Sequence, residues 1–404
     1  MKNFGTIGLA AASLFAFAVF EQGSQVVASA AGPSETSNAP YRVLAPIQSG
    51  NLLLFPVVRS YGKSPGETPF ITLDEGIKSG EVEVTEAGRV QGLVRPRSDF
   101  PQNRRYPDTT QTYRGDQVNT LVLVNNSPRP LLLLAGEIVT GGKQDRVIAK
   151  DRIVPAGADP IDLGVFCIEP GRWTESSATF GAAAKAPSHG FMVQPTVRER
   201  AMVQKDQQQV WDSVRGAISQ MAVAAAPPPS PGSGRAPNAT SFGTTSYAKV
   251  MESNAVSDKV DEAAAPVMKS RDQVLAKLRE QHAVGVIVAV RGEIVWADLF
   301  ANTELLSRYW TKLVRSYAAE SLTNGETRTA PSVADAQHFL DAPTGGIETS
   351  EGSVGVYRYR ELKSNGTSTF ILESLLPETG YDVHISKMKL RNPDNPVAPP
   401  QIYR

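Results

Sequence analysis

The chain has 404 residues, enough for two or three ordinary domains or one large duplicated unit. The chain has 41 basic residues (lysine and arginine) and 41 acidic residues (aspartate and glutamate), so the formal net charge is zero. A chain without a basic excess lacks the charge that attracts nucleic acids and anionic lipids, and we expect neither partner. Its single cysteine, Cys167, cannot form an internal disulfide, so the fold must depend on an apolar core.

The first 30 residues are typical of a cleavable secretory signal peptide. Lys2 gives a positive start, residues 7–20 are almost wholly apolar, and residues 27–30 supply small side chains before a cut at Ala31. The apolar run is shorter than the roughly 20 residues that span a bilayer, which favours cleavage over an uncleaved anchor. No later stretch is long and apolar enough to span a membrane. We therefore expect a soluble mature chain in the periplasm or the medium.

Composition divides the chain into six segments. Small polar residues that should be disordered follow the signal, and two folded halves are separated by a flexible insert rich in Pro, Gly and Ser. The segments are the signal peptide (1–30), the lead-in (31–40), the β-rich first half with its first helix (41–222), the insert (223–247), the α+β second half (248–390) and the tail (391–404).

The first half combines several strand patterns with one short helix. Residues 51–58 are an apolar run broken by Pro56, where a strand should end or bulge. Residues 72–80 have a capping threonine, acids in the first turn and a final glycine, which predicts a helix. Residues 118–124 and 130–134 are apolar runs around an Asn/Ser/Pro turn, which predicts a hairpin.

The middle and the second half supply the longer helices. Apolar residues between 203 and 221 fall on one helical face, and a helix over 258–282 should break near Pro266. Residues 284–300 form two apolar runs around a tight glycine turn, and an amphipathic helix follows over 304–320. We expect an α+β fold, with mostly antiparallel β units at both ends and a helical middle packed on them.

Charged and amide side chains are concentrated between residues 136 and 173, at the ends of predicted strands. Three glycines within seven residues let the backbone approach a ligand, and charged strand ends can form a binding cleft. In an antiparallel meander the strand ends alternate between the two edges of the sheet. The charged strand ends should therefore fall on the same edge and form one contiguous patch. The alternative is a buried ion-pair network that only fixes the turns. The candidate ligand-binding residues are Glu137, Lys143, Gln144, Asp145, Arg146, Glu169, Arg172 and, at the rim, Trp173.

No residue pattern identifies a catalytic or metal centre. The chain has no GxSxG elbow, P-loop, HExxH or Rossmann glycine motif, and its four histidines lack metal-ligand spacing. We therefore expect no metal and no cofactor, and histidines that are surface or hydrogen-bonded core residues. Cys167, near the end of an apolar run, should be buried and inert. Trp211 and Trp310, at helical spacing, should belong to the core.

The charged segment also carries a resemblance to a bacterial family. Four pieces of the sequence carry this resemblance. They are TLDE at 72–75, GGKQDR at 141–146, GRW at 171–173 and VGVIVAVRGEIVWADLF at 284–300. In these pieces the chain resembles the ARG and rhodanese-phosphatase-superfamily associated protein domain, where ARG denotes ADP-ribosylglycohydrolase. The resemblance covers about residues 41–390. The family name implies a connection to ADP-ribose by association.

We expect a binding or sensor-like module of unknown ligand. One alternative is a hydrolase on a nucleotide- or sugar-linked substrate, with Glu137 or Glu169 as general base and Arg146 or Arg172 holding an anion. Another is a protein-interaction module that docks through the Pro-rich insert. The sequence leaves open whether the partner is a small ligand or a protein, and whether the chain is an enzyme.

Overall fold

The computed structural model describes most of the chain between Tyr41 and Leu390. The described residues are 29–30, 41–60, 66–86, 120–172, 176–182, 190–227, 240–268, 271–323, 327–344, 346–364, 366–377 and 379–390. The predicted lead-in and tail, and the signal peptide before Ser29, lie outside these residues.

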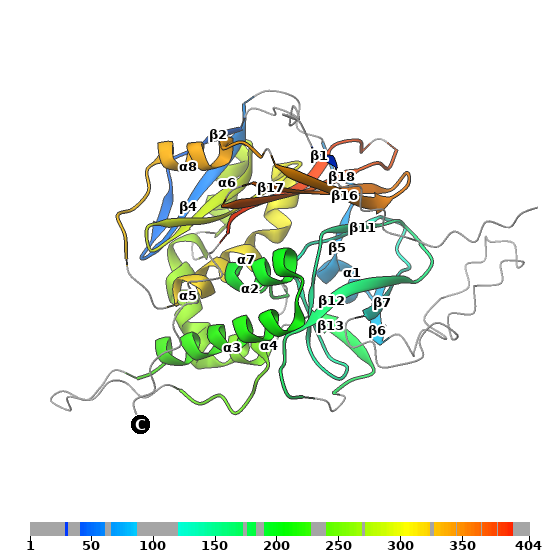
Figure 1. Cartoon of the computed structure of the whole chain (residues 1–404), viewed down its shortest axis with the longest axis horizontal. Helices are drawn as coiled ribbons and strands as arrows, with labels where there is room; N and C mark the ends of the chain where they lie inside the picture. The colour runs from blue at the N-terminus through cyan, green and yellow to red at the C-terminus, as the bar shows by residue number, and fades with distance from the viewer. Residues whose placement is uncertain are drawn as a thin grey trace, which may run out of the picture.

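A ten-stranded antiparallel sheet forms the upper layer of the molecule in Figure 1. It joins the first and second halves of the folded chain, because β4 near one edge pairs with β14. From edge to edge the strands are β1 (Ser29–Ala30), β16 (Ile347–Ser353), β17 (Tyr357–Ser364), β18 (Thr367–Ser374), β19 (Asp382–Lys389), β15 (Glu293–Phe300), β14 (Ala283–Val290), β4 (Leu52–Arg59) and β2 (Tyr41–Val43), with β3 (Ile47–Ser49) also paired to β4.

The rest of the first half forms two smaller sheets beside the helices. Six strands close on themselves in the order β10 (Arg146–Ile148), β12 (Ile161–Cys167), β7 (Thr120–Asn125), β6 (Val82–Glu86), β13 (Thr179–Ala182) and β9 (Ile138–Thr140). The three-stranded sheet contains β11 (Arg152–Val154), β8 (Leu131–Leu133) and β5 (Ile71–Thr72). Alternate leucines of β8 face two cores, since Leu131 and Leu133 join the core of the closed sheet while Leu132 joins the main core.

The helices other than α8 lie on one side of the large sheet or alongside the smaller sheets (Figure 1). Trp310 and Tyr317 of the central helix are fully buried in the main core. The helices are α1 (Leu73–Ser79), α2 (Pro195–Glu199), the π-helical turn η3 (Arg200–Gln204), α3 (Gln207–Ala224), α4 (Tyr247–Glu252), α5 (Asn254–Met268), α6 (Arg271–Glu280), α7 (Thr303–Ser321) and, on the opposite face of the sheet, α8 (Val333–Asp341). The predicted α+β fold with mainly antiparallel β units is confirmed.

Local signals placed several elements correctly. The Thr72 side chain accepts from the Glu75 backbone while the Glu75 carboxylate accepts from the Thr72 backbone, which forms a capping box at the start of α1. Gly80 ends α1 in the left-handed conformation. Pro266 lies inside α5, and α6 begins at Arg271. At both ends of α1 a hydrogen bond or a backbone conformation within a few residues decides the boundary.

The predicted hairpin of residues 118–124 and 130–134 is wrong. β7 pairs with β6 and β12, whereas β8 pairs with β5 and β11 in another sheet. Asn125 explains the separation, because its amide donates to the carbonyls of Arg129, Val154 and Pro155. These side-chain hydrogen bonds stabilise a turn that directs the chain out of one sheet and into the next.

Pro56 neither ends nor bulges its strand, contrary to the prediction. β4 continues through it to Arg59, with Pro56 opposite Val286 of β14. The Pro56 carbonyl accepts from the backbone of Leu44, in the gap between β2 and β3. Because no strand residue pairs there, the missing N–H of proline leaves no ladder hydrogen bond unformed.

The predicted insert is shorter than 223–247. α3 continues through Ala224, and α4 begins at Tyr247, whose side chain is fully buried. Burial of an aromatic ring stabilises the start of α4, so Tyr247 belongs to the folded part. Residues 228–239 lie outside the described part.

Trp211 of α3 is only half-buried, so the prediction that it belongs to the core is wrong.

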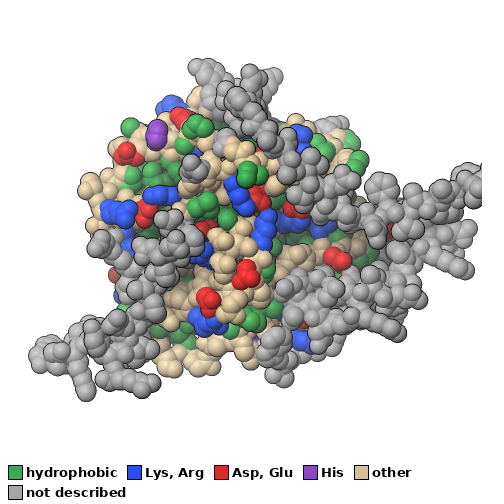
Figure 2. Space-filling view, in the orientation of Figure 1, with side chains coloured by type: hydrophobic (Ala, Val, Ile, Leu, Met, Phe, Trp, Pro, Cys, Tyr) green, Lys and Arg blue, Asp and Glu red, His purple; other side chains and the backbone are tan. Residues whose placement is uncertain are grey.

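No helix in the described residues combines the length and apolarity needed to cross a bilayer. Figure 2 shows acidic and basic side chains interspersed over the visible face, without a patch of one sign. This distribution agrees with the equal numbers of acidic and basic residues in the sequence.

Candidate functional site

Three of the predicted site residues meet at one corner of the closed sheet. β10 pairs with β12 so that Arg146 lies opposite Cys167, and this register brings Asp145 next to Glu169. Arg172 Nη2 lies 2.6 Å from Glu169 Oε2 and 3.5 Å from Asp145 Oδ1. Both carboxylates are buried. The antiparallel pairing expected from the sequence therefore does bring these strand ends together.

Asp145 is held by neutral donors as well. The Gly141 backbone donates to Oδ1 at 3.1 Å, and the Ser246 hydroxyl donates to Oδ2 at 2.6 Å. Ser246 is also the N-cap of α4, so this contact joins the helical middle to the closed sheet. Charges that are buried and paired in this way stabilise turn geometry, which supports the structural alternative over an open ligand site at Asp145.

The neighbouring candidates, Arg146, Gln144 and Lys143, form no ion pair with Asp145 or Glu169 among the contacts of the described residues. Arg146 is buried, lies 5.9 Å from the Phe180 ring centroid and donates to the Gln144 carbonyl at 2.5 Å. The Gln144 side chain is also buried, whereas Lys143 is exposed. Trp173, the proposed rim residue, lies outside the described residues.

Glu137 belongs to a different buried group, so the expectation of one contiguous patch is wrong for this residue. Gly136, at φ 94°, turns the chain before β9 begins, and Glu137 then faces α7. Its Oε1 lies 2.6 Å from Lys312 Nζ, and its Oε2 accepts from the Leu134 backbone at 2.7 Å. Sequence proximity to Asp145 could not reveal this partner, because Lys312 is far along the chain.

Lys312 links Glu137 to Asp74, which reaches the surface. Lys312 Nζ lies 2.6 Å from Asp74 Oδ2, and the Gly190 backbone donates to the same oxygen at 3.0 Å. Burial raises the pKa of Glu137, and Lys312 opposes that shift. Burial alone would lower the pKa of Lys312, but Asp74 and Glu137 together raise it. The group is a carboxylate–ammonium–carboxylate chain that runs from the core to Asp74.

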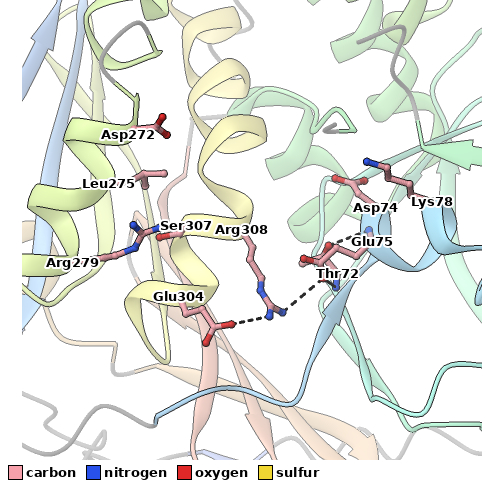
Figure 3. Close-up of a pocket in the computed structure, with 10 residues that line it drawn as sticks. All are labelled: Thr72, Asp74, Glu75, Lys78, Asp272, Leu275, Arg279, Glu304, Ser307 and Arg308. Carbon is pink, nitrogen blue, oxygen red and sulfur yellow. Dashed lines mark hydrogen bonds and ion pairs between the residues drawn. The ribbon is translucent and has the colours of Figure 1, made fainter. Parts of the chain in front are cut away.

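Asp74 lines a cleft of about 660 Å³ between α1, α6 and α7. This size suits a small-molecule ligand. Figure 3 shows α7 between the other two helices, with side chains from all three directed toward the gap. The lining residues are Thr72, Asp74, Glu75, Lys78, Asp272, Leu275, Arg279, Glu304, Ser307 and Arg308.

The cleft contains both paired and unpaired cations. Arg308 Nη2 lies 2.7 Å from Glu304 Oε1, and its Nη1 lies 3.7 Å from Glu75 Oε2. Lys78 and Arg279 are exposed, and neither forms an ion pair with any residue that the structure describes. In Figure 3 the Arg279 guanidinium extends from α6 toward α7, and Lys78 lies beside Asp74 on the far wall. Lys78 and Arg279, which form no ion pair with a described residue, thus line opposite walls, and the carboxylates of Asp74 and Asp272 line the same cleft.

A second polar group, centred on His384, is fully enclosed by the core. His384 Nδ1 lies 2.6 Å from Asp151 Oδ2, and its Nε2 lies 3.1 Å from Asp298 Oδ1. Arg198 Nη1 donates to Asp298 Oδ2 at 2.9 Å, and the Tyr317 hydroxyl donates to the same oxygen. All five side chains are inaccessible to solvent or nearly so. The expectation of a hydrogen-bonded core histidine holds for His384.

The pKa values of this group follow from its pairing. Burial would lower the pKa of His384, but Asp151 and Asp298 raise it to about 9. Burial would raise the pKa of Asp298, but Arg198 and His384 hold it far below its ordinary value. The group therefore contains two cations and two carboxylates that balance one another. Among the described residues, no three His, Cys, Asp or Glu side chains are arranged to hold a metal ion.

The shift of His384 predicts a loss of stability in alkali. A histidine whose pKa is raised from 6.5 to about 9 stabilises the folded state fully below pH 6.5 and loses that effect as pH rises through 9. The loss should approach roughly 3 kcal/mol in the free energy of unfolding, measured by urea denaturation between about pH 6 and about pH 10. His384→Gln should remove this pH-dependent step; an unchanged step would contradict its assignment to His384.

Cys167 is buried, as expected, and its neighbourhood predicts low reactivity. Its backbone exchanges two hydrogen bonds of 2.9 Å with the side chain of Gln207. Burial raises the pKa of the thiol, and Arg146 opposes that shift. A thiol reagent should label the native protein at least about a hundredfold more slowly than the urea-unfolded protein. Rapid native labelling would contradict this expectation.

The sequence does not reveal the residues that form the cleft. Asp74 and Glu75 have the pattern of acids in the first turn of a helix, and Glu304, Arg308 and Arg279 belong to no recognisable motif. One signal was present, since TLDE at 72–75 is part of the family resemblance. Nothing in the sequence indicated that α1, α6 and α7 enclose a common space.

The comparisons with known proteins agree with the resemblance found in the sequence. The model of the ARG and Rhodanese-Phosphatase-superfamily-associated Protein domain, ARPP-1, matches residues 40–388. Neither a curated protein nor a solved structure matches the chain. Because the family model covers most of the chain, the protein belongs to the ARPP-1 family of ARG and Rhodanese-Phosphatase-superfamily-associated Protein domains.

Proposed function

We propose that this protein binds a small anionic molecule in the cleft between α1, α6 and α7. The observation that carries the proposal is the pair of exposed cations, Lys78 and Arg279, which line opposite walls without an ion-pair partner among the described residues. A ligand anion between them would supply the missing counter-charge to both walls. Arg308 adds a third cation on α7, already held by Glu304 and Glu75.

The ligand class that suits these groups is a phosphorylated small molecule. Guanidinium groups bind phosphate oxygens through paired, charge-assisted hydrogen bonds, and an ammonium adds a compact point charge. Ser307 lines the same cleft, and its hydroxyl oxygen, which donates to the Thr303 carbonyl, can accept from a ribose or sugar hydroxyl. The family description connects the domain by name with ADP-ribosylglycohydrolase, so ADP-ribose, which carries two phosphates, is the first probe to use.

The arrangement favours binding over hydrolysis. A general base must reach its proton at hydrogen-bond distance, with a carboxylate available to accept it. Glu75 and Glu304 are both paired with Arg308, and Asp74 is paired with Lys312. Glu137 has a raised pKa but is buried inside the protein, behind Asp74. A hydrolase is the second candidate and makes a different prediction, the appearance of product.

Isothermal titration with ADP-ribose, and with inorganic phosphate as the minimal anion, tests the proposal. Arg279→Gln and Lys78→Gln should each weaken binding about tenfold, because each removes one charge-assisted contact. Lys277→Gln is the matched control, since Lys277 is exposed on the same helix but does not line the cleft. Binding should also weaken with salt. No binding of either anion, or equal binding by Arg279→Gln, would overturn the proposal.

Chromatography of the same mixtures separates binding from catalysis. Unchanged ADP-ribose after prolonged incubation would agree with a binding module, whereas product formed by the wild type but not by Arg279→Gln would assign a hydrolase to the cleft. The third hypothesis, docking through the Pro-rich insert, predicts that ligand binding in the cleft is absent. Residues 228–239 of that insert lie outside the described residues.

We further propose that the protein is exported, as the N-terminal sequence predicts. β1 contains Ser29 and Ala30, the last two residues of the predicted signal, and it pairs only with β16 at the sheet edge. Cleavage before Ala31 would remove β1 and leave the nine other strands of this sheet in place. An intact mass from the periplasm or medium that starts at Ala31 supports export. A mass that includes residues 1–30 would reject it.

A further inference from the structure

A second cavity lies on the face of the ten-stranded sheet opposite to α7. It has a volume of about 320 Å³ and is lined by β15, β17, β18 and β19, by Tyr41 of β2 and by the end of α8. Side chains alternate along β15, so Trp296 and Phe300 enter the main core while Ala297 and Leu299 face α8. This cavity shares no lining residue with the cleft between α1, α6 and α7.

Part of the cavity lining is aliphatic. Ala297 and Leu299 of β15, Ile371 of β18 and Ile385 of β19 line it from the sheet. Leu340, at the end of α8, lines the opposite wall. A hydrocarbon group placed here would be removed from water, which stabilises binding in proportion to the apolar area buried.

Lys387 is a buried cation in this apolar setting. It is 2 % exposed, and its Nζ donates to the carbonyls of Leu340 at 3.1 Å and Ala342 at 2.7 Å. An ammonium group has three donors, so one N–H is left for a further acceptor. Lys387 forms no ion pair with any described residue, and burial lowers its pKa to about 8, with Asp341 opposing. The pKa agrees with a cation that lacks a close counter-ion.

Two more donors in the cavity lack acceptors. Thr369 is 4 % exposed, and its hydroxyl is buried without a hydrogen-bond partner. The Nε of Arg360 is also buried without a partner, and its guanidinium lies 3.9 Å from Glu348 and 4.0 Å from Asp382, beyond hydrogen-bond distance. Buried donors normally have partners, so three incompletely satisfied donors around one cavity indicate a site shaped for an acceptor group.

We propose that this cavity is a second ligand site, which binds a small monocarboxylic acid with a short apolar chain. The carboxylate accepts from Lys387, Thr369 and Arg360, and the chain covers Leu299 and Ile371. The aliphatic residues in the lining favour a carboxylate that carries a hydrocarbon chain over inorganic phosphate. The volume corresponds to that of roughly ten water molecules, which suits an acid of about six carbons.

Titration of the full chain with hexanoate, against its neutral counterpart hexanamide, tests the site. Hexanoate should bind at least about tenfold more tightly, because only the carboxylate provides a charge to Lys387. Affinity should rise about fourfold for each methylene between butanoate and hexanoate. It should fall above pH 8, as Lys387 loses its proton. Tyr41, Asp341, Arg360 and Asp382 are the other ionisable groups that line the cavity.

Two variants and one matched control locate the binding. Lys387→Met should weaken hexanoate binding at least about tenfold, and Thr369→Val, which keeps the shape of the side chain, should weaken it several-fold. Lys389→Gln is the control, since Lys389 is exposed on the same strand and does not line the cavity. If Lys387→Met does not fold, Thr369→Val and the pH profile of the wild type decide.

The proposal would be overturned if hexanoate did not bind at millimolar concentration, or if hexanamide bound with equal affinity. It would also be overturned if Thr369→Val left the affinity for hexanoate unaltered and that affinity did not weaken above pH 8. Both cavity variants should keep the affinity of the α1, α6 and α7 cleft for inorganic phosphate. The two sites can therefore fail independently.

Discussion

Replacing Asp298 by Asn should lower the free energy of unfolding by about 3–5 kcal/mol. Asp298 is the only anion between two buried cations of its group, since Arg198 contacts one carboxylate oxygen and His384 the other. An amide of the same shape keeps the volume but leaves the Arg198 guanidinium without its counter-charge inside the core. The penalty is mainly the cost of that unpaired buried charge, and urea denaturation at neutral pH measures it.

Two further variants separate charge from shape. Asp212→Asn changes an exposed carboxylate that contacts Arg215 and Gln208 of its own helix, and it should leave stability unchanged within error. Arg198→Met combined with Asp298→Asn removes both charges and keeps the aliphatic stem, so part of the lost stability should return. An Asp298→Asn variant as stable as the wild type would show that the group does not stabilise the folded state as described.

Replacing Lys312 by Met should also cost about 3–5 kcal/mol at neutral pH. Lys312 is 3 % exposed and lies within 2.6 Å of both Glu137 and Asp74. Without the ammonium, Glu137 is a buried carboxylate whose remaining described donor is the Leu134 backbone. Asp74 keeps some access to water through the cleft, so most of the loss should come from Glu137.

The pH dependence of this variant identifies Glu137 as the source of the loss. A carboxyl whose pKa is raised above 4.5 in the folded state favours folding when protonated, so the deficit should shrink as pH falls. Adding Glu137→Gln to Lys312→Met should recover much of the stability at neutral pH. Lys259→Met, at an exposed ion pair with Glu262, should have little effect. A deficit that is constant with pH would argue against this assignment.

The sequence by itself determined the elements whose ends depend on neighbouring residues. The capping box of Thr72 and Glu75, the left-handed Gly80 that ends α1 and the glycine turn between β14 and β15 all use contacts within a few positions. Apolar periodicity likewise predicted that Trp310 and Cys167 would be buried. The approach of Asp145 to Glu169 followed from antiparallel pairing of adjacent strands.

Only the tertiary structure decided which strands pair over long distances and which charges share a site. β4 crosses to β14, and β8 leaves β7 for another sheet, because side-chain hydrogen bonds and the two cores select those neighbours. The same choices place Lys312 between Glu137 and Asp74, and His384 between Asp151 and Asp298. These pairs join segments far apart in the chain. Periodicity describes one face of one element, and it contains no information on which distant element will cover that face.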